Sequence, residues 1–298
     1  MSKSSKILIA VLIFLGAVYA VQRFTSTNST TETSKPFDGV DTAKITDIAI
    51  HSGVDLEMSR QDKRWMITSP VHFPVSSGQI SLFLSRIASD PVASVVAENL
   101  SDSSAYGLDA SAISLQVMQS NGKKMALRVG NVTPDFDGCY VQIAGSDKVL
   151  NLSTNLRSLA GESLTDWRDK KVFNFREDDI SNVDISVGDT LYHFFHSDTL
   201  WRVNGTEIPA TEAQSVLDEL VGTNAYSFID STVNVTEPMV DYGFTLANRE
   251  HVAGRIFKLA DKVCLTNSAN NQVYVVSSTL PTDLEESLRM LKRDYLTN

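Results

Sequence analysis

The side chains that most often bind metals are few in this sequence and poorly spaced for a site. The 298-residue chain has five histidines and two cysteines. Only His193 and His196 lie close together, and residues three apart on a strand point to opposite faces. The acidic run 177–179 lacks the spacing of a calcium-binding loop. We therefore expect no metal site, ordinary strand positions for the two histidines and a solvated loop for the acidic run.

The sequence also lacks the motifs that mark common catalytic sites. It contains no nucleophile elbow, Walker A loop, HExxH zinc motif or EF-hand loop. Catalysis needs a convergent set of titratable groups, and no such set is evident along the chain. We therefore expect a protein that is not an enzyme, with no catalytic residue and no cofactor.

The densest cluster of aromatic and charged residues is Trp167, Arg168 and Asp169. Arg168 could clamp an anion or contact a partner, since its guanidinium offers several donors. The alternative, which we favour, is an ion pair of Arg168 with Asp169 that fixes a junction between two lobes, with Trp167 in the core. Because the surrounding segment 165–175 is apolar and aromatic, we expect it to pack between the lobes and limit their movement.

The chain is acidic and has the composition of a folded globular protein. Its formal net charge is −10, with 42% hydrophobic and 21% charged residues. A nucleic-acid-binding protein would carry a basic patch, so nucleic acid is not expected as a partner. Anionic lipid headgroups would also repel this surface. We attribute the charge to solubility.

Residues 7–21 form an uninterrupted uncharged stretch that follows Lys3 and Lys6. Extended to residue 24, the stretch reaches the lower part of the length range of a transmembrane anchor, and the positive flank predicts that residues 1–6 are cytoplasmic. The alternative is a cleaved signal peptide. Both interpretations place the bulk of the chain outside the cytoplasm. We favour the anchor, which makes this a single-pass inner-membrane protein with a periplasmic bulk, joined by a flexible Ser/Thr-rich tether over residues 25–43.

The body of the chain repeats itself. Trp65 has a counterpart in Trp201, and Tyr106-Gly107-Leu108 has one in Tyr242-Gly243-Phe244 at the same spacing. Matches that recur in one order indicate tandem copies of one domain. We place the first copy at residues 44–170 and the second at residues 171–298.

The two cysteines, Cys139 and Cys264, lie at nearly matching places in the two copies. Equivalent points of two neighbouring domains are usually too far apart for a disulfide. We therefore favour two buried thiols. A bond between them is the alternative, because surroundings outside the cytoplasm would permit it.

Hydrophobic patterning predicts an α+β fold in each copy, an antiparallel sheet with helices packed against it. Alternating apolar residues predict strands, for example at Ile48 and Ile50. Apolar residues at helical spacing lie next to capping-box patterns, which predict helix starts. Those patterns are Ser76 with Gln79, Thr211 with Gln214, and Thr282 with Glu285.

The tyrosine-glycine pairs are interpreted as architecture. Gly107 and Gly243 are expected to supply turns with positive φ, which a Cβ would disfavour. Tyr106 and Leu108 would then anchor the first turn in the core as the next strand starts. Tyr242 is expected to be an anchor of the second copy in the same way.

Several stretches of the sequence resemble a known family of bacterial proteins. In order they are "ITDIAI", "KRWMITSPVHFPVSSGQISLFLSRI", "AYGLD", "LRVGNVTPDFDGCYVQ", "VLNLS" and "DWRDK". The family is catalogued as domain of unknown function 4340, and the resemblance covers residues 44–298. Its motifs are structural, so the resemblance implies a family and no mechanism. Members typically accompany parts of an ABC-type exporter, namely an ATPase, a permease and a gliding-motility-type auxiliary protein.

The resemblance, the anchor and the missing chemistry together imply a membrane-anchored periplasmic accessory or scaffold protein of an ABC-type transporter complex. Its partners would be the permease and the auxiliary protein. The alternative is a periplasmic protein that binds a small molecule or glycan in the cleft between its two duplicated lobes. An enzyme with an unfamiliar site is the third and least supported class.

Overall fold

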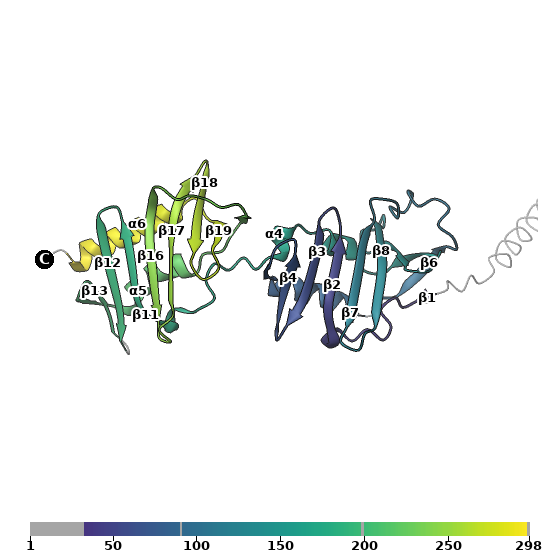
Figure 1. Ribbon diagram of the computed structural model, residues 1–298, viewed down its shortest axis with the longest axis horizontal. Coiled ribbons are helices and arrows are strands. Elements are labelled where there is room, and N and C mark those ends of the chain that lie inside the picture. Colours follow the sequence, from purple (N-terminus) through teal and green to yellow (C-terminus); the bar gives the residue numbers. More distant parts are fainter. Residues whose placement is uncertain (1–32, 90, 198–199, 297–298) are drawn as a thin grey trace, which may run out of the picture. The chain divides into compact units, whose positions relative to one another are not determined.

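The computed structural model describes residues 33–89, 91–197 and 200–296. The chain divides into two compact units, the first ending at Arg168 and the second beginning at Asp169. Each unit has one large antiparallel sheet and a few helices (Figure 1). The expectation of α and β elements built around antiparallel sheets is therefore confirmed.

The first unit is built on a ten-stranded sheet in the order β1-β6-β10-β9-β8-β7-β2-β3-β4-β5. Its strands are β1 (Thr33–Ser34), β2 (Ile45–His51), β3 (Asp55–Gln61), β4 (Arg64–Ser69), β5 (Phe73–Pro74), β6 (Ala93–Ala97), β7 (Ile113–Gln119), β8 (Lys124–Val132), β9 (Cys139–Ile143) and β10 (Val149–Leu152). Buried and accessible residues alternate, as along β2, where Ile48 and Ile50 are buried and Asp47 is exposed. One face of the sheet therefore carries the core.

Helices pack on the apolar face of the first sheet. They are η1 (Thr42–Lys44), α2 (Ser77–Ala88), α3 (Leu156–Ala160) and α4 (Leu164–Trp167). Helix α2 begins after Ser76, whose hydroxyl accepts a hydrogen bond from the N–H of Gln79 at 3.4 Å, so the predicted start is confirmed. Its buried residues Ile80, Phe83 and Ile87 recur at helical spacing and join the strand residues in one core.

The second unit is built on a nine-stranded sheet in the order β14-β13-β12-β11-β16-β17-β18-β19-β15. Its strands are β11 (Ile180–Val187), β12 (Thr190–Ser197), β13 (Leu200–Val203), β14 (Thr206–Ile208), β15 (Ser227–Ile229), β16 (Pro238–Leu246), β17 (His251–Leu259), β18 (Lys262–Asn267) and β19 (Gln272–Val275). Its helices are η2 (Glu177–Asp179), α5 (Ala210–Val221), α6 (Leu280–Leu291) and the π-helical turn η3 (Lys292–Leu296). Leu217 and Leu220 of α5 and Leu284 of α6 are fully buried.

The two sheets share one strand order. Without β1, the first sheet runs β6-β10-β9-β8-β7-β2-β3-β4-β5, and the second runs β15-β19-β18-β17-β16-β11-β12-β13-β14. Helix α2 lies between β5 and β6 in the sequence, as α5 lies between β14 and β15. The registers also correspond, since Trp65 pairs with Arg60 across β4 and β3, and Trp201 pairs with His196 across β13 and β12. Counterpart positions in the two units can therefore be assigned strand by strand.

The tether predicted over residues 25–43 is wrong from residue 33 onward. Thr33 and Ser34 pair with β6, and Phe37 is 2% exposed within the core of the first unit. The N–H of Asp41 donates to the side-chain carbonyl of Gln119 at 2.9 Å. The Ser/Thr-rich composition hid the aromatic residue, whose burial acts together with the pairing of β1 and the hydrogen bond of Asp41 to order this stretch.

Two of the three predicted capping boxes are also wrong. Helix α5 starts after Pro209 and α6 after Thr279, and neither start has a side-chain cap. Thr211 and Thr282 therefore lie inside the first helical turns. Proline marks both starts instead, because its ring presets a φ near the helical value and its missing N–H would have had no partner there.

Candidate functional site

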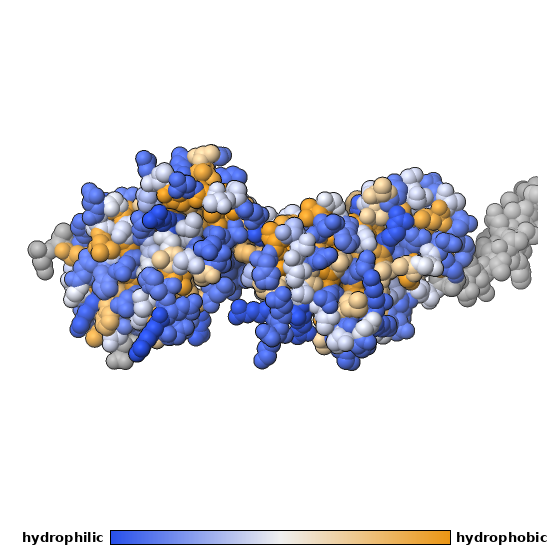
Figure 2. Space-filling model, viewed as in Figure 1, coloured by the Kyte–Doolittle hydropathy of each residue, from blue (hydrophilic) through white to orange (hydrophobic). Residues whose placement is uncertain are grey.

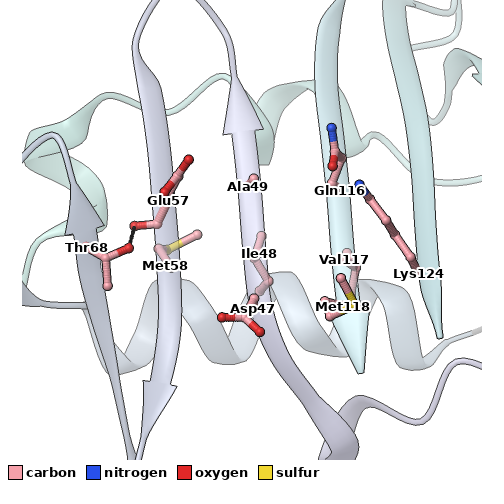
Figure 3. A pocket seen from close by; sticks show the side chains of 10 residues that line it. All are labelled: Asp47, Ile48, Ala49, Glu57, Met58, Thr68, Gln116, Val117, Met118 and Lys124. Carbon is pink, nitrogen blue, oxygen red and sulfur yellow. Dashed lines mark hydrogen bonds between the residues drawn. The ribbon is translucent and has the colours of Figure 1, made fainter. Parts of the chain in front are cut away.

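The open face of each sheet, which is the face opposite its helices, carries the accessible side chains of the central strands. In the first unit it holds a pocket of about 160 Å³ (Figure 3). The pocket is lined by Asp47, Ile48, Ala49, Glu57, Met58, Thr68, Gln116, Val117, Met118 and Lys124. These residues come from β2, β3, β4, β7 and β8, so only the folded sheet assembles them.

Ala49 explains why a pocket forms at this point. It pairs with Glu57 on β3 and with Gln116 on β7, and Figure 3 shows these two longer side chains on either side of it. Neighbours on one face of a sheet lie about 5 Å apart. A methyl group between two extended side chains therefore leaves a hollow. The sequence offered one signal for it, an alanine between the two buried isoleucines Ile48 and Ile50.

The rim of the pocket carries charges of both signs. Asp47 and Glu57 contribute carboxylates, and Lys124 contributes an ammonium group. The hydroxyl of Thr68 donates to the backbone carbonyl of Glu57 at 3.3 Å. Ion pairs and hydrogen bonds to a small polar group are the chemistry that this arrangement supports. The volume is below that of drug-sized ligand sites, which are about 300 Å³ or more.

The counterpart position in the second unit is filled by a charged pair. Asp184 pairs with His193 on β12 and Gly243 on β16, as Ala49 pairs with Glu57 and Gln116. Nδ1 of His193 lies 2.6 Å from a carboxylate oxygen of Asp184. These three paired positions therefore leave a hollow in the first unit, whereas in the second unit the side chains of Asp184 and His193 occupy them.

Three exposed apolar side chains, which we call the apolar stripe, lie on the open face of the second sheet. They are Leu191, Phe195 and Leu200, and His193 lies between the first two on the same face of β12. The three apolar side chains are 55%, 41% and 43% exposed, respectively. Leu191 and Phe195 lie on β12 and Leu200 on β13, and Figure 2 shows apolar surface among hydrophilic surface over β12.

The first unit has polar residues at the counterpart positions of this stripe. The register places Asp55 at the position of Leu191, Ser59 at that of Phe195 and Arg64 at that of Leu200. The fold therefore forms with charged and polar side chains at these positions. The shared architecture therefore does not require apolar residues there.

Part of each open face is covered by the chain's own loops. In the first unit, the ring of Tyr106 packs edge-on against that of Tyr140, with centroids 5.0 Å apart. In the second unit, Val233 and Val235 pack against the buried residues Phe257, Cys264, Val273 and Val275. The pocket and the apolar stripe both lie on other strands of the open faces.

The predicted junction residues Trp167 and Arg168 belong to the first unit. Trp167 is fully buried and packs edge-on against Phe83, with ring centroids 5.7 Å apart. Arg168 is 2% exposed, its guanidinium lies 4.6 Å from the centre of the Phe73 ring, and its backbone forms a bridge with Val75. At 2% exposure the guanidinium offers almost no surface, so its burial argues against the hypothesis that Arg168 contacts a partner.

Asp169 begins the second unit, where its carboxylate accepts a hydrogen bond from the N–H of Lys171 at 3.2 Å. The next residue, Lys170, accepts a hydrogen bond from the N–H of Ala225 through its backbone carbonyl. The cluster predicted from sequence is thus divided between the two units.

The two tyrosine-glycine pairs differ in structure. Gly107 is a turn residue with a φ of 63°, and Leu108 beside it is fully buried, so the predicted turn is confirmed. Tyr106 does not anchor this turn in the core as predicted, because it is only partly buried and packs against Tyr140 on the open face. Gly243 lies within β16 and has no positive φ, so the turn predicted there is wrong. The register instead sets Tyr242 opposite Ile185, where its ring is 4% exposed.

The histidines and acids singled out by spacing have separate partners. His193 lies beside Asp184, whereas His196 stacks on Trp201 with ring centroids 4.3 Å apart. No group of three histidine, cysteine or acidic residues within the described parts of the chain is placed to hold a metal ion.

Glu177 is not fully solvated as expected, since it is only partly exposed in η2, close to α5. Burial, a hydrogen bond with Asp218 and the negative charges of Asp218 and Asp178 raise the pKa of Glu177 to about 7.

Cys139 and Cys264 are both free thiols, and both are buried. Burial raises the pKa of each thiol, which makes the reactive thiolate less populated. Cys139 donates weakly to the backbone carbonyl of Thr154 at 3.4 Å. These are packing residues of two separate units.

Comparison with known protein families shows which family this chain belongs to. The family described as "Domain of unknown function (DUF4340)" matches residues 65–245, which is more than half of the chain. The chain belongs to the DUF4340 family. The matched region of this DUF4340 protein runs from β4 in the first unit to β16 in the second. No curated protein and no solved structure matches it.

The predicted membrane anchor, residues 7–24, lies outside the described residues. Of the helices within them, none is long and apolar enough to cross a membrane.

Proposed function

We propose that this DUF4340 protein is a non-enzymatic scaffold that binds other proteins through the open faces of its sheets. The observation that carries this proposal is the apolar stripe. Its three side chains stay accessible at positions where the first unit has polar residues. Exposed apolar residues gathered on one face are typical of interaction sites, and aromatic residues are enriched at the centres of interfaces.

We further propose that the partners are components of an ABC-type transporter complex, the permease and a gliding-motility-type auxiliary protein. Family membership supports this assignment, because the resemblance described above implies that setting. The apolar stretch 7–24 supports attachment by a transmembrane anchor, with the amino terminus in the cytoplasm and both units in the periplasm. The net charge of −10 argues against binding of the units flat on anionic lipid.

We also infer that the two units arose by tandem duplication. The shared order of nine strands supports this, as does the equivalent placement of Trp65 and Trp201 in the two registers. Duplication provides two copies of one sheet whose open faces then diverge, and the two faces do differ in charge and polarity.

Exchange of the stripe for its counterparts tests the scaffold proposal. The triple variant Leu191→Asp, Phe195→Ser, Leu200→Arg carries the residues that the first unit tolerates, so its melting temperature should stay near that of the wild type. We expect the wild-type chain, purified from native membranes in mild detergent, to retain the permease or the auxiliary protein. The triple variant should lose at least about 90% of either protein, as hot-spot removal does.

The matched control is Val54→Ser, which removes a similarly exposed apolar side chain of the first unit. It should leave co-purification unchanged. Full retention of both proteins by the folded triple variant would contradict binding through the stripe. Absence of every ABC component from the wild-type preparation would contradict the transporter assignment.

The pocket at Ala49 supports a second candidate function, binding of a small polar molecule by the first unit. We expect a zwitterionic compound or an envelope sugar to raise the melting temperature of the wild type, because a specific ligand stabilises the state that binds it. The variant Ala49→Asp installs the side chain of the counterpart Asp184 and should remove that rise. A screen in which no compound shifts the wild type, or in which Ala49→Asp responds equally, would reject this candidate.

A further inference from the structure

The loop between β8 and β9, residues 133–138, holds an aromatic side chain out in solvent. Phe136 is 77% exposed, the highest value among the large hydrophobic residues of the described regions. Its φ is 64°, in the left-handed region that bulky residues rarely adopt. The exposed ring gains little free energy from burial, and the left-handed backbone costs free energy, so Phe136 does not stabilise the fold.

Hydrogen bonds brace the loop in this shape. Thr133 is 3% exposed, and its hydroxyl donates to the Asp135 carboxylate at 2.5 Å and accepts from the N–H of Gly138 at 3.0 Å. The N–H of Phe136 donates to the carbonyl of Thr133 at 2.9 Å. At Gly138 a Cβ would come within 2.4 Å of the carbonyl oxygen of Leu152, so this position requires glycine. The loop therefore presents Phe136 on a preorganised support.

The second unit shows that the sheet does not need such a loop. Its counterpart strands, β17 and β18, are joined by two residues, Ala260 and Asp261. The longer loop of the first unit is thus an addition to the shared architecture, as the apolar stripe is in the second unit.

We propose that Phe136 is an anchor that inserts into an apolar pocket of a partner protein whose rim carries lysine or arginine. Buried aromatic anchors supply much of the affinity of protein interfaces, and a preorganised loop loses little freedom on binding. Asp135 and Asp137 flank the ring, and these carboxylates complement a basic rim. The same charges disfavour an anionic membrane and a second copy of this acidic chain.

This proposal is independent of the apolar stripe, which lies in the other unit. Photo-crosslinking in cells tests it, with p-benzoylphenylalanine placed at position 136 of the full chain and, as a control, at position 54. Val54 is an exposed apolar residue at another turn of the same unit. We expect a covalent product with another protein at least about 10-fold more abundant from position 136. The crosslinked segment of that protein should lie beside lysine or arginine.

Binding by the purified crosslinked protein then decides the role of the ring. Affinity for the full chain should fall at least about 10-fold with Phe136→Gly and with Asp137→Lys, and it should stay unchanged with Val54→Ser. Phe136→Gly should melt at or about 2 °C above the wild type, because glycine adopts this φ without strain. Its loss of affinity therefore could not come from unfolding.

Four results of the crosslinking and binding experiments would overturn the proposal. They are equal crosslinking from positions 54 and 136, a product made only of two copies of this chain, a product with lipid alone, and affinity for the partner within about 2-fold of wild type in Phe136→Gly. A lower melting temperature of Phe136→Gly would also overturn it, since the ring would then belong to the fold.

Discussion

Two glycines that each follow a tyrosine show how single residues act in this protein. A Cβ at Gly107 would lie 2.3 Å from the side-chain oxygen of Asn131 and 2.8 Å from its backbone nitrogen. A Cβ at Gly243 would approach only the ring of His251, at 3.3 Å. The same dipeptide therefore permits a tight turn in one unit and a smooth strand in the other. What a glycine contributes depends on its φ and on its neighbours.

Alanine at the two positions should separate these roles. Gly107→Ala should lower the free energy of unfolding by about 2–4 kcal/mol, because it adds left-handed strain and a contact with backbone. Gly243→Ala should change it by about 0.5 kcal/mol or less, since the imidazole ring can move. Thermal denaturation of both variants measures the difference. Equal effects would contradict the turn at Gly107.

Glu177 makes the stability of the second unit depend on pH. Its pKa in the folded chain, about 7, lies above its ordinary value of 4.5. The stability linked to its protonated form is therefore complete below pH 4.5 and is lost as pH rises through 7. Because the carboxyl is partly exposed, we expect a loss of about 1 kcal/mol between pH 5 and pH 8.

The variant Glu177→Gln tests this dependence. It removes the titrating group, so its free energy of unfolding should exceed that of the wild type at pH 8 and match it more closely at pH 5. Urea denaturation at the two pH values measures both quantities. If the variant lost as much free energy of unfolding between pH 5 and pH 8 as the wild type does, another group would be the cause of the pH dependence.

At the scale of elements, helix starts in this chain are set in two ways. Ser76 caps α2 with its hydroxyl, whereas α5 and α6 start next to the prolines Pro209 and Pro281. A serine or threonine three residues before a glutamine or glutamate is therefore not sufficient evidence for a cap. When proline lies close by, its rigid φ sets the start and the hydroxyl residue falls inside the helix.

Alanine substitutions should reveal which hydroxyls are caps. Ser76→Ala should lower the free energy of unfolding by about 1 kcal/mol, because the N–H of Gln79 loses its acceptor. Thr211→Ala and Thr282→Ala are matched controls inside the first turns of α5 and α6, and each should change stability by less than about 0.5 kcal/mol. Chemical denaturation of the three variants gives the comparison. A loss near 1 kcal/mol for Thr211→Ala would restore the predicted capping box.

At the scale of the whole molecule, the first unit depends on residues at both of its ends. Phe37 lies in its core near the amino end, and Trp167 lies in the same core at the carboxyl end. The second unit begins directly after Arg168. A unit that buries its own boundary residues should fold without its neighbour.

Fragments test this boundary. Residues 33–168 should fold cooperatively, with a near-ultraviolet circular dichroism signal from the buried tryptophan. Residues 33–160 lack Trp167, whose removal costs about 3–5 kcal/mol, so this shorter fragment should be largely unfolded. A stable, cooperative fragment 33–160 would show that Trp167 is not part of the essential core.

The sequence alone determined the family and most of the secondary structure. Alternation of apolar and polar residues predicted the strands, as at Ile48 and Ile50. The spacing of Ile80, Phe83 and Ile87 predicted the buried face of α2. These signals are local, because hydrophobic periodicity reports which side of one element is buried. The resemblance to the family was local in the same sense, because it rested on six short stretches of sequence in a fixed order.

Only the tertiary structure decided which residues meet. The pocket around Ala49 needs five strands, and the polar counterparts of the apolar stripe appear only when two sheets are compared in register. The sequence also did not reveal that Arg168 is buried and Phe136 is exposed, because arginine is usually exposed and phenylalanine is usually buried. Accessibility is a property of the packed neighbours of a residue, most of which are distant along the chain, and no spacing within one strand or loop encodes them.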